Sequence, residues 1–223
     1  MNSGKSIAEI DRIALQDVVP EVFSADDVKD SQVWHGSCVF ERGRSYCVSA
    51  ASGRGKTSMC AFVYGLRRDY RGTILFSGKD IRGYSVDQWC ETRCRHLSYL
   101  SQELDVFPEL TAKENVMLKN GLTGHKTVAE IDRMFERLGI EQCKDRPAGR
   151  MSVGQRQRLA LIRALCQPFD FILLDEPVSH LDAENNKICA GMIEEEASGQ
   201  GAGIISTSVG NPLLLSSAIV LNL

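Results

Sequence analysis

The chain lacks a long apolar run, and this absence limits where it can work. No stretch of about 18 apolar residues occurs, so we expect no helix that spans a membrane by itself. The opening residues, MNSGKSIAEIDRIAL, also lack the apolar stretch that is typical of a secretory signal. The sequence therefore favours a protein without a membrane anchor of its own.

An excess of charge of either sign is missing as well. The formal net charge is −3, from 26 Lys and Arg against 29 Asp and Glu. Because Lys and Arg are not in excess, the composition does not indicate a surface that binds nucleic acid, and no nucleic-acid partner is expected. Internal repeats, low-complexity tracts and coiled-coil heptads are absent too. With 223 residues, of which 43% are hydrophobic, the chain is long enough for one large domain or two small lobes.

Cysteines are numerous, and they occur at positions 38, 47, 60, 90, 94, 143, 166 and 189. Without a secretory signal we expect reduced thiols rather than disulfides. Cys90, Cys94 and His96 are close enough in sequence to suggest a metal site. A structural zinc site needs four ligands, however, and no second pair lies nearby. A helix that carries two thiols one turn apart is the simpler interpretation.

Short apolar runs alternate with helical patterns along the chain. Ile131, Met134, Phe135 and Leu138 recur at helical spacing. A helix is also expected at residues 56–67, and a second amphipathic helix ends at Leu165. Strands are expected at Ser45–Ser49, 73–76, Leu97–Leu100, 169–174 and 203–207. The alternation favours an α/β fold with a largely parallel sheet covered by helices, interrupted by a helical insert at about residues 85–166.

A glycine-rich segment, ASGRGKTS at residues 51–58, follows the first of these strands. It matches the phosphate-loop pattern G-x-x-x-x-G-K-[S/T], except that Ala50 replaces the first glycine. Glycines let backbone N–H groups turn toward phosphate oxygens, and the helix after the loop adds the positive end of its dipole. Lys56 would reach the β and γ phosphates, and Thr57 would offer its hydroxyl to Mg²⁺. We therefore predict a phosphate site rather than an ordinary turn, formed by Ala51, Ser52, Gly53, Arg54, Gly55, Lys56, Thr57 and Ser58.

A second motif, FILLDEP at residues 171–177, ends an apolar strand in two adjacent acids. Ligands bind at this edge of open α/β sheets. Asp175 would hold Mg²⁺ directly or through water, and Glu176 would polarise an attacking water as a general base or as its orienter. The alternative is a polar turn after the strand, but two neighbouring acids repel each other there without purpose.

A third motif, MSVGQRQRLALIRAL, occupies residues 151–165. It resembles the signature helix of the ATP-binding cassette (ABC) family, whose usual opening is LSGGQ. Ser152, Gly154 and Gln155 match that opening, whereas Met151 replaces the Leu and Val153 replaces the first glycine.

Two further segments match the same family in the expected order. Gln102 resembles the glutamine of the family's Q-loop. The sequence SHLD at residues 179–182 resembles the D-loop, with His180 where Ala is usual. The resemblance covers residues 13–221, which is nearly the whole chain.

The resemblance implies the fold of a P-loop NTPase: an α/β core with a mostly parallel sheet, an antiparallel β edge and an inserted helical subdomain, within a single nucleotide-binding domain at residues 1–223. It also implies ATP as the nucleotide, with Mg²⁺. Phe23 is the candidate aromatic that stacks on adenine, and Trp34 and Tyr46 are its rivals.

In this family two cassettes pack head to tail, so that the loop of one copy and the signature of the other enclose each ATP. The implied partners are a second cassette, identical or different, and an integral membrane permease that docks near Gln102. Together they would place the chain at the cytoplasmic face of the cell membrane. The implied signature-side contacts are Ser152, Gly154, Gln155 and Asp182, and the implied magnesium ligands are Thr57, Gln102 and Asp175.

One departure from the family concerns the catalytic residues, which by resemblance are Glu176, Gln102 and Ser208. The family usually carries a histidine after the strand that follows the D-loop, but GIISTSVG places Ser208 there, and no histidine follows His180. Serine is shorter and cannot carry positive charge, and the loss of one such contact can cost on the order of 10² in rate. Together with Ala50 and Val153, this replacement predicts slow hydrolysis or a better-equipped partner cassette.

Three other functions stay open at this point. The first is a cassette that binds ATP as a regulatory clamp and barely turns over. The second is a soluble cassette in DNA maintenance, which normally needs long coiled-coil arms. The third is an assembly factor for cofactors such as iron–sulfur clusters, which only the many cysteines suggest.

Overall fold

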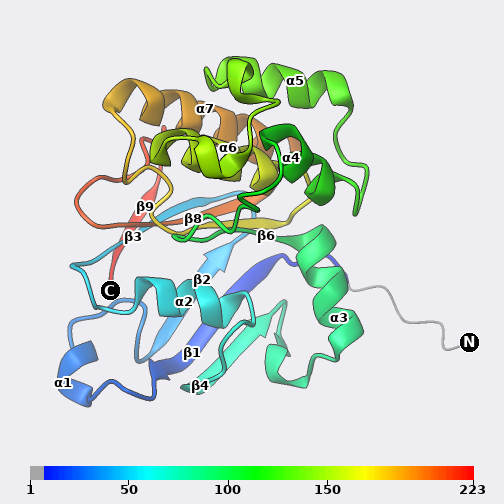
Figure 1. The fold of residues 1–223 in the computed structure, drawn as a ribbon. Coiled ribbons are helices and arrows are strands. Elements are labelled where there is room, and N and C mark those ends of the chain that lie inside the picture. The colour runs from blue at the N-terminus through cyan, green and yellow to red at the C-terminus, as the bar shows by residue number, and fades with distance from the viewer. Residues whose placement is uncertain (1–7) are drawn as a thin grey trace, which may run out of the picture.

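Two sheets organise the computed structural model of the chain, which describes residues 8–223 (Figure 1). The antiparallel sheet has the order β2-β1-β4-β5 and the parallel sheet the order β6-β7-β8-β3-β9. The mixed α/β architecture with a parallel sheet and an antiparallel edge confirms the predicted fold class. The strands are β1 (Arg12–Pro20), β2 (Ser37–Glu41), β3 (Ser45–Ser49), β4 (Tyr70–Phe76), β5 (Lys79–Asp80), β6 (Leu97–Leu100), β7 (Phe171–Leu174), β8 (Gly203–Ser208) and β9 (Ile219–Asn222).

Capping boxes set the start of four helices. A Ser or Thr at the N-cap of α3, α4, α5 and α6 accepts a hydrogen bond from the third helical residue, whose Gln or Glu side chain bonds back to the cap. The helices are α1 (Ala25–Val28), α2 (Lys56–Val63), α3 (Val86–Glu91), α4 (Ala112–Asn120), α5 (Val128–Arg137), α6 (Val153–Leu165) and α7 (Ala183–Gln200). Short 3-10 turns lie at Ile81–Gly83, Glu141–Cys143 and Ala148–Arg150, and a π-helical turn at Thr92–His96.

The helix predicted at residues 56–67 ends earlier than expected. Gly65 adopts a φ of 72°, which stops the helix and lets Leu66 N donate to Ala61 O at 2.8 Å. A Cβ at this position would lie 2.4 Å from the Trp89 ring, so only glycine permits the close approach of α3.

The parallel sheet separates two hydrophobic cores. Side chains of β7 alternate between them: Ile172 and Leu174 pack with α4–α7, and Phe171 and Leu173 pack with α2 and the antiparallel sheet. Figure 1 shows this layering, with α4–α7 on one side of the sheet and α2, β1 and β4 on the other. Burial of both faces explains why the sequence of β7 is continuously apolar.

The predicted start of the helical insert, at about residue 85, is too early. β6 pairs in register with β7, from Leu97↔Phe171 to Leu100↔Leu174, and is therefore a strand of the core. Trp89 of α3 packs with the antiparallel side. The segment rich in helices thus begins after Leu100 and returns to the core sheet at the end of α6.

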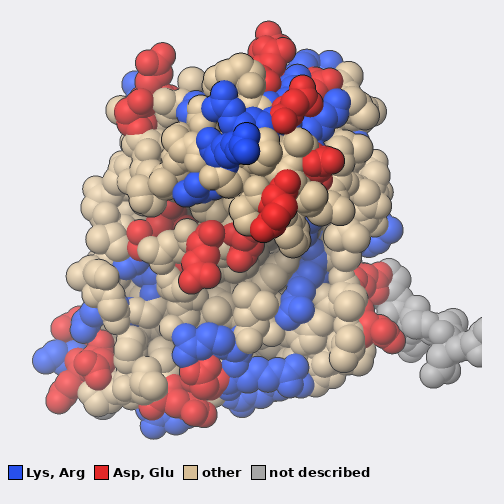
Figure 2. All heavy atoms as spheres, in the orientation of Figure 1, with Lys and Arg blue, Asp and Glu red and all other residues tan. Residues whose placement is uncertain are grey.

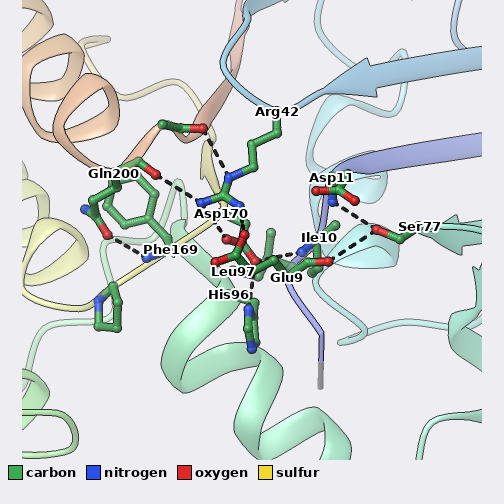
Figure 3. A network of polar contacts seen from close by, with 12 residues as sticks. Glu9, Ile10, Asp11, Arg42, Ser77, His96, Leu97, Phe169, Asp170 and Gln200 are labelled. Carbon is green, nitrogen blue, oxygen red and sulfur yellow. Dashed lines mark hydrogen bonds and ion pairs between the residues drawn. The ribbon is translucent and has the colours of Figure 1, made fainter. Parts of the chain in front are cut away.

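A buried polar network connects residues of the two sheets and of α7 at the end of the parallel sheet where β7 begins (Figure 3). The carboxylate of Asp170 lies 2.7 Å from His96 Nδ1 and 3.2 Å from Arg42 Nη2, and it accepts a hydrogen bond from Ile10 N at 2.8 Å. Arg42 Nη2 also donates to Gln200 O at 3.0 Å. His96 is thus bound to a carboxylate, and no cluster of metal-ligating side chains occurs within residues 8–223.

The surface mixes charges of both signs. On the face drawn in Figure 2, acidic and basic side chains are interspersed. No helix in the described part of the chain is long and apolar enough to cross a membrane.

Candidate nucleotide-binding site

The glycine-rich segment forms a loop between β3 and α2. Gly53 and Gly55 adopt φ values of 80° and 94°, which L side chains rarely adopt. A Cβ on Gly55 would lie 3.1 Å from the Phe23 ring and 3.3 Å from Trp34, so a side chain there would also require these rings to shift slightly. Ala50, where the pattern has its first glycine, is not among the described residues with positive φ, so it carries no such strain. This replacement therefore leaves the loop conformation intact.

Lys56 lies inside the loop and is almost fully buried. Its Nζ donates to Ala50 O at 3.0 Å and to Ala51 O at 2.9 Å, and it lies 3.9 Å from Glu176 Oε1. Burial lowers the pKa of this amino group, whereas the carboxylates of Glu176 and Asp175 act in the opposite direction. A cation is thus held where the loop turns, beside the two acids of the second motif.

Asp175 is completely buried at the end of β7. Its Oδ1 accepts a hydrogen bond from Thr207 Oγ1 at 2.6 Å, whereas its Oδ2 is buried and has no partner among the described residues. Glu176 follows with a φ of 51°, and its N–H donates to Thr207 Oγ1 at 3.1 Å. Because β7 and β8 pair in parallel register, both acids lie beside the end of β8.

Gln102 follows β6 and reaches the loop from the neighbouring strand. Thr57 Oγ1 donates to Gln102 Oε1 at 3.3 Å. These two oxygens and the free Oδ2 of Asp175 are the hard donors that Mg²⁺ prefers, so the residues present fit this ion. A cavity of about 290 Å³ lies here and is lined by Phe23, Ser52, Gly53, Gly55, Lys56, Thr57, Ser58, Gln102 and Glu176.

The aromatic candidates differ in what they can contact. Trp34 is buried, and its Nε1 donates to Arg54 O at 3.3 Å. Tyr46 is buried too, and its hydroxyl accepts a hydrogen bond from Glu41 N at 2.9 Å. Phe23 alone of the three is partly exposed and lines the cavity. The geometry therefore favours Phe23 as the adenine contact, which stays a prediction.

The signature residues lie outside this cavity. Ser152 caps α6, and its hydroxyl accepts a hydrogen bond from Gln155 N at 3.2 Å. Gly154 packs against the D-loop, because a Cβ added to Gly154 would lie 3.5 Å from His180 O. Asp182 caps α7, and the hydrogen bonds it accepts from Asn185 lower its pKa. None of these residues lines the cavity of the loop, so the fold keeps them apart from Lys56 and Glu176.

Ser208 is buried at the end of β8, and its Oγ has no partner within residues 8–223. Its carbonyl accepts a hydrogen bond from Ala50 N at 3.3 Å, so it adjoins the start of the loop. His180 is exposed, with its Nδ1 3.0 Å from Ser179 Oγ.

Two buried polar residues of this region were missed in the sequence. Thr207 bonds both Asp175 and Glu176, and Gln157 donates to Glu176 O at 3.1 Å. The available signals were a threonine directly before Ser208 and a polar residue on the buried face of the signature helix.

Comparisons with known proteins point in one direction. A family model described as ABC transporter matches residues 36–179, more than half of the chain. The cytochrome c biogenesis ATP-binding export protein CcmA of Bordetella bronchiseptica is 32% identical over 173 residues, which is 75% of this chain and 73% of CcmA. The lipoprotein-releasing system ATP-binding protein LolD of Shewanella denitrificans is 29% identical over 198 residues, 87% and 84% of the two chains.

A solved structure shares the fold. It is the dimeric post-hydrolysis state of the ATP-binding cassette MJ0796 bound to ADP and Pi. The TM-score is 0.74 at 20% sequence identity, and the match covers 89% of this chain and 88% of the other.

Proposed function

This chain belongs to the ABC transporter family, and we propose that it is the subunit that binds and hydrolyses ATP to drive a membrane permease. The observation that carries this proposal is the convergence of Lys56 and Glu176 on one cavity, 3.9 Å apart, beside the free oxygen of Asp175. A cation for phosphate, an acid for water and an oxygen for a metal ion are the parts that phosphoryl transfer to water needs.

The residues divide the chemistry among them. Backbone N–H groups of the loop and the ammonium of Lys56 bind the β and γ phosphates. Thr57, Gln102 and Asp175 would hold Mg²⁺, which neutralises phosphate charge when it is bound. Glu176 orients the attacking water and takes its proton. Thr207 fixes both acids, because its hydroxyl donates to Asp175 and accepts from Glu176 N.

Each ATP is enclosed by two cassettes in this proposal. Ser152, Gly154 and Gln155 stand at the N-terminus of a 13-residue helix, which favours an anion. They lie outside the chain's own cavity and are therefore free to complete the site of a second copy, identical or different. The dimeric state of MJ0796 supports this arrangement by its fold.

The permease would dock in a groove beside the Q-loop. This groove has a volume of about 210 Å³ and lies between α2, β6 and the helices α4 and α6. It is lined by Leu66, which is 59% exposed, and by Tyr64 and Tyr99, whose ring centroids lie 5.0 Å apart with the ring planes tilted by 42°. Lys119 and Arg163 add positive charge. LolD and CcmA are named as ATP-binding proteins of a releasing system and of export, which supports a transport role. In this proposal the chain works at the cytoplasmic face of the membrane, attached through that permease.

A second function, the slowly hydrolysing clamp, is favoured by one observation. Ser208 is buried where the family carries a histidine, and its hydroxyl has no hydrogen-bond partner in the part of the chain that the structure describes. In this version ATP closes the dimer, and turnover serves only to release it.

Measurements of ATP hydrolysis, followed as phosphate release, and of ATP-dependent dimerisation test the transporter subunit and the clamp together. Wild-type chain with Mg-ATP should hydrolyse it, and Glu176→Gln should lose on the order of 10² in turnover and accumulate as an ATP-bound dimer in size-exclusion chromatography with light scattering. Equal turnover of wild type and Glu176→Gln, with ATP-dependent dimers of both, would favour the clamp. A wild-type chain that binds no ATP in calorimetry would refute both versions.

A further inference from the structure

Gln157 is a buried glutamine one turn inside the signature helix α6, with 1% of its surface exposed. Its Nε2 donates to Glu176 O at 3.1 Å and to Ser179 Oγ at 3.3 Å. Its Oε1 accepts a hydrogen bond from His180 N at 3.3 Å. One side chain thus holds three positions of the segment between β7 and α7.

Burial of this amide is costly unless it is hydrogen-bonded, and here both of its polar atoms have partners. The next buried residues of α6, Leu159 and Ala160, face the hydrophobic core. An apolar residue would serve packing as well at position 157, so what the amide adds is its hydrogen bonds to the segment between β7 and α7.

The backbone of Glu176 depends on two outside contacts. Its φ of 51° is a conformation that non-glycine residues adopt at a cost and keep only when their surroundings hold them. Thr207 Oγ1 accepts a hydrogen bond from its N–H, and Gln157 Nε2 donates to its carbonyl. One of these anchors belongs to the core strand β8 and the other to α6. The direction of the Glu176 side chain therefore depends on where α6 lies relative to the sheet.

The start of α6 also contacts this segment. A Cβ on Gly154 would lie 3.5 Å from both His180 O and Leu181 Cδ2, so the signature turn packs directly on the D-loop. In the ATP sandwich this turn would contact the nucleotide on the partner's loop, whereas Glu176 faces the nucleotide in its own cavity. The two contacts of one chain thus belong to different ATP sites.

We propose that Gln157 is a positioning residue that couples the two ATP sites of the dimer. When the signature of one chain binds the nucleotide in one ATP site, α6 shifts relative to the sheet. Through Gln157 this shift aligns Glu176 of the same chain in the other ATP site. The inference rests on the proposed ATP sandwich. It implies that hydrolysis is positively cooperative in ATP, with a Hill coefficient near the limit of about 2 that two sites allow.

The test compares two buried glutamines of the same region. Gln157→Met keeps the side-chain volume but removes the hydrogen bonds to Glu176, Ser179 and His180. Gln167→Met is the matched control, because Gln167 is also 1% exposed and donates to the backbone carbonyl of Arg93 at 3.0 Å, away from Glu176. Both variants are measured for unfolding temperature, ATP affinity, kcat, KM and Hill coefficient.

For Gln157→Met we expect kcat to fall roughly tenfold and the Hill coefficient to fall from about 2 to about 1, with ATP affinity unchanged in calorimetry. Gln167→Met should lower the unfolding temperature alone. Unchanged cooperativity in Gln157→Met, or equal losses in both variants, would overturn the coupling. A wild-type enzyme that hydrolyses ATP with a Hill coefficient of 1 would also overturn it while leaving the ATPase intact. A chain that binds no ATP would instead refute the proposed function.

Discussion

Two aspartates flank the same four-residue strand, β7, and their surroundings are opposite. Asp170, before the strand, is bonded by Arg42, His96 and Ile10 N (Figure 3). Asp175, after the strand, has Thr207 on one oxygen and no partner on the other within the described residues. Both are buried, so both would destabilise the fold without compensation. Asp170 is compensated from within the chain, whereas Asp175 keeps one unpaired oxygen, which our proposal assigns to a bound metal ion.

An unpaired buried atom does not mark a site by itself. Trp89 Nε1 and Thr92 Oγ1 also have no hydrogen-bond partner within residues 8–223, and neither residue lines the cavity of the loop. The end of β7 at Asp175 differs because Lys56 and Glu176 lie next to it. We therefore propose that Asp170 stabilises the fold at one end of β7, whereas Asp175 serves the nucleotide site at the other.

The largest effect should come from Asp175→Asn. The amide has a single, neutral oxygen, which the hydrogen bond from Thr207 occupies, so no anionic oxygen is left for the metal ion. Turnover should therefore fall on the order of 10²- to 10³-fold. The free energy of unfolding should change by less than about 1 kcal/mol, because Asn still accepts the hydrogen bond from Thr207. ATPase assays and urea titrations check both numbers. Loss of stability as the main effect would make Asp175 a structural acid.

Asp170→Asn should show the reverse. It leaves the guanidinium of Arg42 beside a neutral amide, and removing one partner of a buried pair costs about 3 kcal/mol. Turnover per folded molecule should stay at the wild-type value. Urea titrations and ATPase assays of the folded fraction measure the two quantities. A turnover as low as that of Asp175→Asn would erase the contrast between the two ends of β7.

The pH dependence of ATP binding should reveal Lys56. Burial lowers the pKa of its amino group below 10.5, so in the free protein it loses its proton at a lower pH than a surface lysine. Phosphate binding needs the charged form, and ATP affinity should fall by about tenfold per pH unit above that lowered pKa. The free energy of unfolding should change with pH in the opposite direction to ATP affinity. It should increase as pH rises from the lowered pKa of Lys56 toward 10.5, because the neutral amine is the form that burial favours.

Calorimetry with a non-hydrolysable ATP analogue between pH 8 and 10 measures this dependence. Lys56→Arg is the control, because a guanidinium stays charged throughout. Its affinity should be weaker and independent of pH. A wild-type affinity that does not change over this range would mean that Lys56 keeps an ordinary pKa.

The smallest effect should come from Ser208→His. The added imidazole would act on the γ-phosphate and the water more in the transition state than in the ground state. We expect a gain of at most tenfold, about 1.4 kcal/mol, because Ser208 is buried and its neighbours have not adapted to a larger side chain. If His180 of the second copy already fills this role, His180→Ala should depress turnover sharply and Ser208→His should add little. Steady-state ATPase assays on Ser208→His and His180→Ala separate the two explanations. Unchanged turnover in both variants would contradict both explanations.

Contiguous motifs explain why part of the site could be predicted. The loop at residues 51–58 and the Asp175–Glu176 pair are each read from one stretch, and the structure brings Lys56, Gln102 and Glu176 to one cavity. Thr207 and Gln157 were missed because their partners lie 32 and 19 residues away in the sequence. The insert boundary was misplaced because β6 is only four residues long, and pairing with β7, rather than its own pattern, makes it a core strand.

The most direct measurement is the Mg²⁺ dependence of nucleotide affinity in wild type, Asp175→Asn and Asp170→Asn. Calorimetry with a non-hydrolysable ATP analogue is run with Mg²⁺ and with EDTA. We expect Mg²⁺ to strengthen binding at least tenfold in wild type and in Asp170→Asn, and to leave binding by Asp175→Asn nearly unchanged. Equal strengthening in all three proteins would contradict the assignment of the free oxygen of Asp175 to the metal of an ATP site.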